Sequence, residues 1–271
     1  MLAGAVAVLA ATTSRSTTDT APERDLTFPA PAVGRTLHYA AYLPDDYEAS
    51  RRRYPVVYFL HGLPAGPTAY RDAGFVARAL AQIHRKAIVV APQAADSDDT
   101  DPEYLDRGPN HDWESALTDE LVHAVDKRLR TIPRRDGRAI VGLSAGGYGA
   151  MLLALHHPEL YAAVQSWSGY FHPTDPTGRL PLDLGSSAAN TRASVHAQIR
   201  ARASARLAIA FYVGSSDTRF LQENRLLDRE LRAAGIPHVF KVYPGGHSHA
   251  LWQEHAAHWL RMLFTHLTQA S

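Results

Sequence analysis

The sequence has no cysteine among its 271 residues. This excludes a disulfide framework, a thiolate metal site and a cysteine nucleophile, so any nucleophile must be an oxygen or a nitrogen. The sequence also has no excess of charge of one sign, because 28 Lys and Arg residues face 27 Asp and Glu residues. The basic residues are scattered along the chain, and we therefore expect no binding to nucleic acid.

A long hydrophobic run is missing as well. The apolar residues 2–11 are too few to span a bilayer, which needs about 20 residues. Their small side chains and the polar tract that follows are typical of a signal-peptide remnant or a truncated membrane segment, although no Lys or Arg stands between Met1 and the run. We expect residues 1–25 to lie outside the fold. The expected location is secreted or in the cell envelope, and a cytoplasmic location is the alternative.

Residues 26–271 have the composition of one globular domain, since 45% of the whole chain is hydrophobic. Apolar, β-rich runs alternate with segments of helical periodicity. The expected strands are 35–44, 54–62, 87–93, 138–143, 162–169, 206–214 and 238–244, and the expected helices are 73–84, 113–129, 145–155, 191–200, 219–234 and 249–268. This alternation predicts an α/β fold with a mostly parallel sheet covered by helices on both faces.

Two longer connections remain between these elements. Residues 94–112 are rich in Asp, Pro and Gly, which predicts a surface loop. The insertion at 170–190 is too short for a large helical lid, so we expect an open cleft.

A candidate nucleophile lies between an expected strand and an expected helix. Residues 142–146 read Gly-Leu-Ser-Ala-Gly and fit the pattern G-x-S-x-G. A strand that turns sharply into a helix strains the backbone at the serine, and the flanking glycines allow close approach of neighbouring chain. The helix directs its N-terminal N–H groups toward a developing oxyanion. The motif in this context predicts that Ser144 is a nucleophile; a Gly-rich tight turn is the alternative.

A serine nucleophile needs a base, and the base needs an acid that orients it. Asp217 follows the strand that ends at residue 214, and His247 follows the last strand, so both are expected at the same edge of the sheet as Ser144. Asp217 has a second interpretation as the N-cap of the next helix, with Glu223 and Asp228 as the alternative acids. His249 is the alternative base. Two glycines directly before His247 favour it over His249.

The sequence also suggests which residues donate to the oxyanion and which side chains form the substrate pocket. The N–H of Ala145 is the first donor, since Ala145 follows the nucleophile. The second is expected from the loop after strand 54–62, with the N–H of Leu63 preferred. The candidate substrate-binding side chains are His61, Tyr148, Trp167 and Trp252, with Phe171 as a further aromatic. Aromatic residues at such positions belong to a hydrophobic core more often than to a pocket.

Four segments, PVVYFLHGLP, GLSAGGYGA, GSSD and YPGGHSHALW, resemble the "Putative esterase" branch of the α/β-hydrolase superfamily. This branch groups esterase D-like enzymes, feruloyl esterase modules and mycolyltransferases, and the resemblance covers residues 26–267. It implies the α/β-hydrolase fold and a triad of Ser144, Asp217 and His247. The implied activity is that of a serine carboxylic ester hydrolase, without a cofactor, acting on a small-molecule or glycan-linked ester.

Two departures from the family's pattern bear on the reaction. Mycolyltransferases of this branch typically use Glu as the acid and carry an Arg soon after the oxyanion loop, where this chain has Asp217 and Pro64. Hydrolysis is therefore favoured over transfer of the acyl group to a sugar or lipid alcohol, which remains the alternative. A non-catalytic binding module on the same fold is the third hypothesis. The identity of the ester and the oligomeric state are not predicted.

We also considered metal binding and did not predict it. The acidic residues of segment 96–103 resemble an oxygen-rich calcium loop, but the central Gly and the final Glu of an EF-hand are missing. His247, His249, His255 and His258 are close in sequence, but they form no H-E-x-x-H motif. The sequence therefore predicts a metal-independent site.

Overall fold

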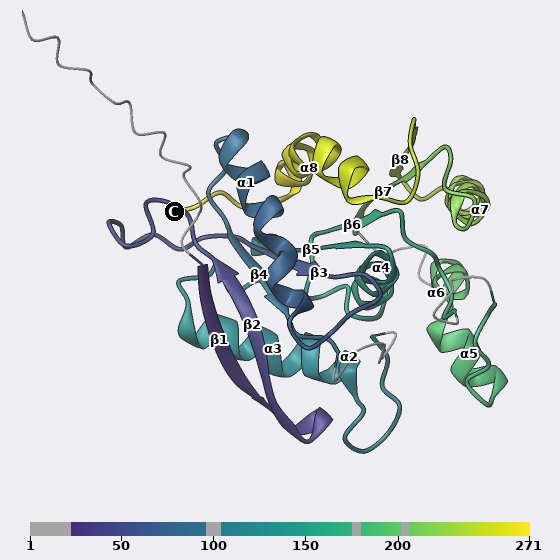
Figure 1. The fold of residues 1–271 in the computed structure, drawn as a ribbon, viewed down its shortest axis with the longest axis horizontal. Coiled ribbons are helices and arrows are strands. Elements are labelled where there is room, and N and C mark those ends of the chain that lie inside the picture. Colours follow the sequence, from purple (N-terminus) through teal and green to yellow (C-terminus); the bar gives the residue numbers. More distant parts are fainter. Residues whose placement is uncertain (1–22, 96–103, 175–179, 202–205) are drawn as a thin grey trace, which may run out of the picture.

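The computed structural model describes residues 23–95, 104–174, 180–201 and 206–271. Eight strands form one sheet in the order β1-β2-β4-β3-β5-β6-β7-β8 (Figure 1). Strands β3 to β8 run parallel, and β1 and β2 are antiparallel to their neighbours. The predicted α/β architecture with a mostly parallel sheet is therefore confirmed.

The central strands are buried on both faces. The parallel strands are β3 (Val56–Leu60), β4 (Ile88–Pro92), β5 (Arg138–Leu143), β6 (Ala163–Trp167), β7 (Ala208–Gly214) and β8 (His238–Tyr243). The runs of β-branched and aromatic residues in β3 to β7 fit a sheet that helices cover from both sides, whereas β8 lies at the edge and is partly exposed. Because these strands are parallel, the loops that follow them emerge at one edge of the sheet.

The antiparallel end of the sheet begins earlier than predicted. Strand β1 (Glu23–Ala30) pairs along its whole length with β2 (Arg35–Tyr42). The expected boundary at residue 25 was therefore wrong by three residues. Glu23 to Asp25 are exposed and polar, so hydrophobic patterning gives no signal for a strand there, whereas pairing with β2 satisfies their backbone. Residues 2–11 lie outside the described residues.

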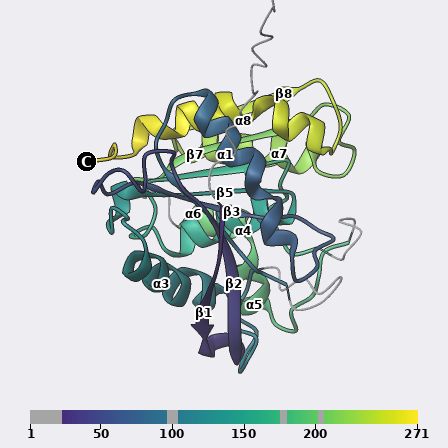
Figure 2. The ribbon, with the colours of Figure 1, turned by 60° about the vertical axis from the view of Figure 1, so that its left-hand side comes forward.

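Helices cover the two faces of the sheet unequally (Figure 2). On one face α1 (Gly74–Gln82) and α8 (His249–Leu263) pack on the sheet and share one hydrophobic cluster. The other face carries α3 (Leu121–Arg128), α4 (Ala145–His156), α6 (Val195–Ala201) and α7 (Leu221–Ala233), with a second cluster beneath them. The shorter helical pieces are α2 (Trp113–Ser115), α5 (Ser187–Ala193), η1 (Pro31–Val33), η2 (Ala69–Ala73), η3 (Ala116–Glu120), η4 (Arg135–Gly137) and η5 (Phe264–His266).

Two predicted helices are divided in the structure. The expected helix 113–129 consists of α2, a π-helical turn at Ala116–Glu120 and α3. The expected helix 191–200 is two helices, because extended backbone at Ser194 separates α5 from α6. These two helices have seven residues each, so the described residues between β6 and β7 contain no long helix, which fits the predicted absence of a large lid.

The connection at 94–112 is only partly the surface loop that we expected. Tyr104 and Leu105 are buried in the core, and the Tyr104 hydroxyl donates a hydrogen bond to the His61 carbonyl oxygen at 2.6 Å. The Tyr104 ring lies so close to Gly149 of α4 that a Cβ there would come within 2.3 Å of it. This contact depends on tertiary packing, and the local sequence gives no signal for it.

Across the described residues, no helix combines the length and the hydrophobicity needed to cross a membrane.

Candidate active site

The turn from β5 into α4 presents Ser144 in a strained conformation. Its φ is 54° and its ψ is −123°, a combination that costs a non-glycine residue of order 1–3 kcal/mol. Its backbone N–H donates to the carbonyl oxygen of Trp167 at the end of β6, at 2.9 Å, which holds the turn in place. Such strain is typical of a functional turn that raises one side chain above the sheet.

Glycines make this turn sterically feasible. A Cβ at Gly142 would lie 2.0 Å from the carbonyl oxygen of Gly146, and a Cβ at Gly146 would lie 2.1 Å from that of Leu60. No side chain fits at either position without moving the backbone. The two glycines of the motif are thus required for the close packing of β5, α4 and the end of β3.

The loop after β8 carries His247 to the nucleophile. Its Nε2 lies 2.9 Å from the Ser144 hydroxyl oxygen, and its Nδ1 lies 2.7 Å from an Asp217 carboxylate oxygen. Because Asp217 accepts the Nδ1–H, the lone pair on Nε2 faces the serine hydroxyl. Gly245 has a φ of 129°, which glycine adopts readily and which allows the chain to turn before His247.

Asp217 combines the two interpretations that the sequence left open. One carboxylate oxygen accepts the hydrogen bond from His247, and the other accepts the backbone N–H groups of Arg219 and Phe220 at 3.2 and 3.3 Å. Asp217 therefore caps the turn that leads into α7 while it orients the imidazole. Its side chain is 1% exposed, so these hydrogen bonds replace all contact with water.

The alternative residues lie elsewhere. Glu223 contacts His172 and the backbone N–H of Phe171, and Asp228 contacts Arg232 and His238. His249 is exposed at the start of α8, with its ring 5.1 Å from that of Trp252. The structure thus brings Ser144, His247 and Asp217 together, and neither alternative acid takes part.

Two aromatic rings hold the imidazole of His247 between them. Trp252 meets it edge-to-face at a centroid distance of 5.1 Å, and Phe220 lies on another side at 5.3 Å. The Trp252 Nε1–H donates to the Ser168 hydroxyl at 3.1 Å, which fixes the indole. Phe220 was missed by the sequence analysis, and its position three residues after Asp217 is the signal that would have suggested it.

The loop after β3 lies directly on the nucleophile. A Cβ at Gly62 would come within 2.9 Å of the Ser144 Cβ, so glycine is needed for this approach. Leu63 follows it, and a cis peptide bond joins Leu63 to Pro64. Ala145 is the first residue of α4, where the N–H groups at a helix N-terminus have no partner within the helix. Both predicted oxyanion donors thus lie next to Ser144, and their roles stay predictions.

A cavity of about 310 Å³ opens beside these residues. Its walls come from the end of β3, the following loop, α1, the nucleophile strand and the start of α8; the lining residues are Phe59, His61, Gly62, Leu63, Pro64, Ala69, Asp72, Phe75, Leu143, His247, Ser248, His249 and Trp252. His61 and Trp252, which the sequence suggested as substrate contacts, both belong to this lining. Burial lowers the pKa of His61, although its hydrogen bond to Gly62 opposes this effect.

Two other suggested substrate contacts, Tyr148 and Trp167, do not belong to this lining. Tyr148 is completely buried, and its hydroxyl donates to the carbonyl oxygen of Ala193 at 2.7 Å. Trp167 is also completely buried and packs behind Phe59 and Phe75, which themselves face the cavity. Phe171 is buried as well. The sequence shows that these aromatics follow strand ends or the nucleophile, but the direction of each side chain depends on the packing of the helices.

The sequence contains two segments that resemble metal sites, the acidic segment 96–103 and the histidines after β8. The acidic segment 96–103 lies outside the described residues. The histidines after β8 do not converge, since His247 faces Ser144 and the His255 ring stacks on Tyr243 with centroids 3.7 Å apart. Among the described residues, His247, His249, His255 and His258 form no cluster of metal-binding geometry.

Known proteins resemble this chain in sequence and in fold. The profile of the family described as "Putative esterase" matches residues 30–261. Esterase Rv1288 of Mycobacterium tuberculosis (strain ATCC 25618 / H37Rv) is 28% identical over 252 residues, which cover 81% of this chain and 54% of that protein. The chain therefore spans about half the length of this relative.

Two solved structures share most of the fold. An S-formylglutathione hydrolase from Agrobacterium tumefaciens superposes with a TM-score of 0.77 at 19% identity, covering 91% of this chain and 95% of its own. A ferulic acid esterase superposes with a TM-score of 0.75 at 23% identity, covering 90% and 97%. These similarities establish the α/β-hydrolase fold.

Proposed function

This chain belongs to the "Putative esterase" family, and on that basis we propose that it is a serine carboxylic ester hydrolase that works through an acyl-enzyme on Ser144. One observation carries the proposal: a serine hydroxyl in a strained turn lies 2.9 Å from Nε2 of His247, and Nδ1 of the same ring lies 2.7 Å from a buried carboxylate. Nucleophilic catalysis needs these three groups in this order.

In the first half of the reaction, Ser144 Oγ attacks the ester carbonyl carbon while His247 Nε2 accepts its proton. The carbonyl oxygen becomes an oxyanion, which the N–H groups of Ala145 and Leu63 stabilise. Asp217 stabilises the imidazolium through Nδ1. His247 then gives the proton to the departing alcohol as the C–O bond breaks, and the acyl group stays on Ser144.

In the second half, water takes the place of the alcohol. His247 accepts a proton from the water as its oxygen attacks the acyl carbon, and the same two N–H groups hold the oxyanion again. Collapse of this intermediate returns the proton to Ser144 and releases the acid. All protein groups required by both halves of the reaction belong to this chain.

The cavity supports a small acyl or aromatic ester as the substrate. Its volume of about 310 Å³ is at the lower end of the range for small-molecule pockets. Phe59, Phe75 and Trp252 supply apolar walls, while Asp72 and His249 are exposed where the cavity meets solvent. A relative from Xylanibacter ruminicola, named as an endo-1,4-beta-xylanase/feruloyl esterase, is 27% identical over 146 residues, and this similarity favours aromatic acyl esters.

The first experiment addresses Ser144. We expect the wild-type chain to hydrolyse p-nitrophenyl acetate and to gain the mass of one acyl group on Ser144 when deacylation is trapped. Ser144→Ala should lower kcat/KM by about 10⁴–10⁶-fold and prevent labelling by a fluorophosphonate probe. Undiminished hydrolysis by this variant would contradict the assignment of the nucleophile. Absence of any labelling of the wild-type serine would favour a binding module instead.

The second experiment addresses the substrate and the acceptor. A panel of methyl esters graded by acyl length and aromatic character should give the highest kcat/KM for acids that fit the cavity, with hydroxycinnamates above long aliphatic chains. Each reaction is repeated with a competing sugar as the alcohol acceptor, and the free acid and the sugar ester are both quantified. A hydrolase releases free acid at an unchanged yield, whereas predominant formation of the sugar ester would replace hydrolysis by acyl transfer.

A further inference from the structure

A second group of polar side chains converges where α6 meets the first turn of α7, outside the lining of the active-site cavity. His172 lies in the segment after β6, His196 is on α6 and Glu223 is on α7. One donor atom from each of the three side chains lies within 4.8 Å of the other two. His172 Nδ1 is 2.6 Å from Glu223 Oε1, and His196 Nε2 is 3.6 Å from the same oxygen. Three separate elements therefore direct nitrogen and oxygen donors at one point.

The outer contacts of His196 orient it as a ligand. Its Nδ1 lies 2.5 Å from Glu230 Oε2, and Arg200 contacts the other oxygen of Glu230 at 3.2 Å. A carboxylate that accepts the Nδ1–H directs the Nε2 lone pair toward Glu223, which is the arrangement found behind histidine ligands of zinc. The backbone N–H of Phe171 donates to Glu223 Oε1 at 2.7 Å and holds that carboxylate in turn.

The charge of the cluster also favours a cation. Glu223 is 13% exposed, and within the described part of the chain its ion pairs are to histidines and not to Lys or Arg. The carboxylate of Glu223 therefore has no permanent positive partner among the described residues.

We propose that His172, His196 and Glu223 bind a divalent transition-metal ion, with Glu230 as a positioning residue for His196. Two imidazoles and one carboxylate are a donor set typical of zinc, with bond lengths of about 2.0–2.1 Å that separate tetrahedral ligands by roughly 3.3 Å. The separations of 2.6 and 3.6 Å bracket this value, so small side-chain movements accommodate the ion. His172 is 34% exposed, which leaves a coordination position open to water.

The ion would tie the insertion after β6 to the helix that follows the catalytic acid. Asn224, next to Glu223, already donates a hydrogen bond to the carbonyl oxygen of Gly169 at 2.7 Å. Ligation by His172 and His196 adds α6 and the start of the insertion to the same support. The site therefore stabilises the scaffold beneath Asp217, and it supplies no group to the ester reaction itself.

The test is metal binding by purified full-length chain without a histidine tag. After treatment with a chelator, the protein is titrated with zinc by calorimetry and with cobalt by visible absorption. We expect one ion per chain and a rise in Tm of about 5–10 °C when zinc exceeds its Kd by about 100-fold. His172→Ala, at a partly exposed position, should weaken binding at least 100-fold and remove the rise in Tm.

Two further variants separate ligation from mere proximity of histidines. His172→Cys keeps a ligand at this position, so it should retain binding and add a sulfur-to-cobalt charge-transfer band in the near ultraviolet. His157→Ala removes a histidine from a different carboxylate cluster and should bind zinc like the wild type. The proposal is overturned if the wild-type chain binds no stoichiometric ion, if His172→Ala binds as tightly as the wild type, or if the cysteine variant shows no such band.

Discussion

Two buried carboxylates in this molecule each hold histidines, yet only one of the two arrangements is suited to catalysis. Asp217 and Glu114 are 1% and 2% exposed, and each accepts a hydrogen bond from a histidine Nδ1. The difference lies at the opposite nitrogen of the ring. In His247 this nitrogen faces the Ser144 hydroxyl, whereas in His156 it faces the carbonyl oxygen of Arg192 at 3.0 Å.

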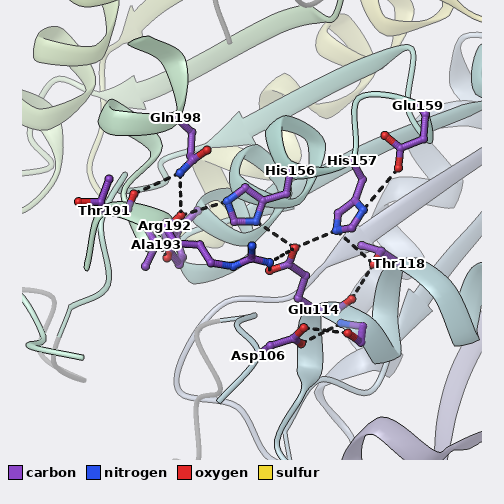
Figure 3. A network of polar contacts seen from close by, with 12 residues as sticks. Asp106, Glu114, Thr118, His156, His157, Glu159, Thr191, Arg192, Ala193 and Gln198 are labelled. Atoms are coloured by element: carbon purple, nitrogen blue, oxygen red, sulfur yellow. Dashed lines mark hydrogen bonds and ion pairs between the residues drawn. The ribbon is translucent and has the colours of Figure 1, made fainter. Parts of the chain in front are cut away.

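The contacts of Glu114 make a structural cross-link (Figure 3). Its carboxylate is contacted by His156 at the end of α4, by His157 and by Arg192 of α5, at 2.8–3.1 Å. Both ring nitrogens of His156 face oxygen acceptors, so neither is available as a base. The role of a carboxylate–histidine pair therefore depends on the group that the outer nitrogen of the ring contacts.

Substitution of His247 and of His156 should have very different effects on activity. His247→Gln removes the base, so kcat for p-nitrophenyl acetate should fall by about 10⁵-fold while Tm changes little. His156→Gln is the matched control in the other cluster: it should keep activity within a few-fold and lower Tm. Stopped assays and thermal unfolding of both variants measure this, and an active His247→Gln enzyme would contradict the mechanism.

The next effect concerns the acid. Asp217→Asn preserves the oxygen that caps the turn before α7 but no longer holds His247 in the required tautomer, so kcat should fall by about 10³–10⁴-fold with a small change in Tm. Asp228→Asn is the control, because Asp228 was the other candidate acid and lies against His238. Steady-state kinetics of the two variants test which residue is the catalytic acid. Equal losses of kcat in both variants would contradict the role assigned to Asp217.

A smaller change in free energy is expected when Glu114 is substituted. This change should lower the stability of the fold and not the activity. Burial alone would raise the pKa of Glu114, but hydrogen bonds from His156 and His157 and the charge of Arg192 hold it well below its ordinary value. Glu114→Gln leaves these groups without their anion, so unfolding free energy should fall by about 3 kcal/mol. Urea unfolding measures this loss, with activity per folded molecule unchanged. A variant as stable as wild type would show that the cross-link contributes nothing.

The smallest effect is a pH dependence of that cross-link. The hydrogen bond with Glu114 raises the pKa of His157, against the opposing effect of burial. A raised pKa in the folded state means that this stabilisation is complete below the unfolded value of about 6.5 and is lost as the pH rises through the folded value. The stability difference between wild type and His157→Gln should be about 1 kcal/mol at pH 6 and smaller at pH 9.

A double variant sharpens this last prediction. In a Glu114→Gln background, His157 has lost its carboxylate, so adding His157→Gln should cost nearly the same at pH 6 and at pH 9. Urea unfolding of the four proteins at both pH values completes the cycle. A pH dependence that persists without Glu114 would assign the effect to another group.

Much of the fold could be predicted because its signals are local. Apolar runs such as 54–62 and 138–143 identify strands covered on both faces, and a parallel sheet places the loops that follow them at one edge. Strand β1 gave no such signal, since its first three residues are polar and are held by pairing with β2. The π-helical turn at Ala116–Glu120 likewise leaves no mark on hydrophobic periodicity.

Some residues of the candidate site could likewise be predicted from the local sequence, and others could not. Ser144 was predictable because its strain and its two glycines are adjacent in the chain. The choice between Asp217 and Glu223 was open, because both follow the same strand and only the direction of each side chain separates them. Tyr148 and Trp167 lie outside the cavity lining, since Tyr148 is buried against Ala193 and Trp167 against Phe59 and Phe75, and this burial depends on the packing of the helices and not on sequence position.

Most of the elements and the order of the reacting groups follow from the sequence, because a strand, a sharp turn and a helix are specified by residues next to one another. The tertiary structure alone decided the separations of 2.9 and 2.7 Å around His247, the walls of the cavity and the meeting of His172, His196 and Glu223. These contacts join segments far apart in the chain. Their geometry follows from how the helices pack on the sheet, which no local pattern specifies.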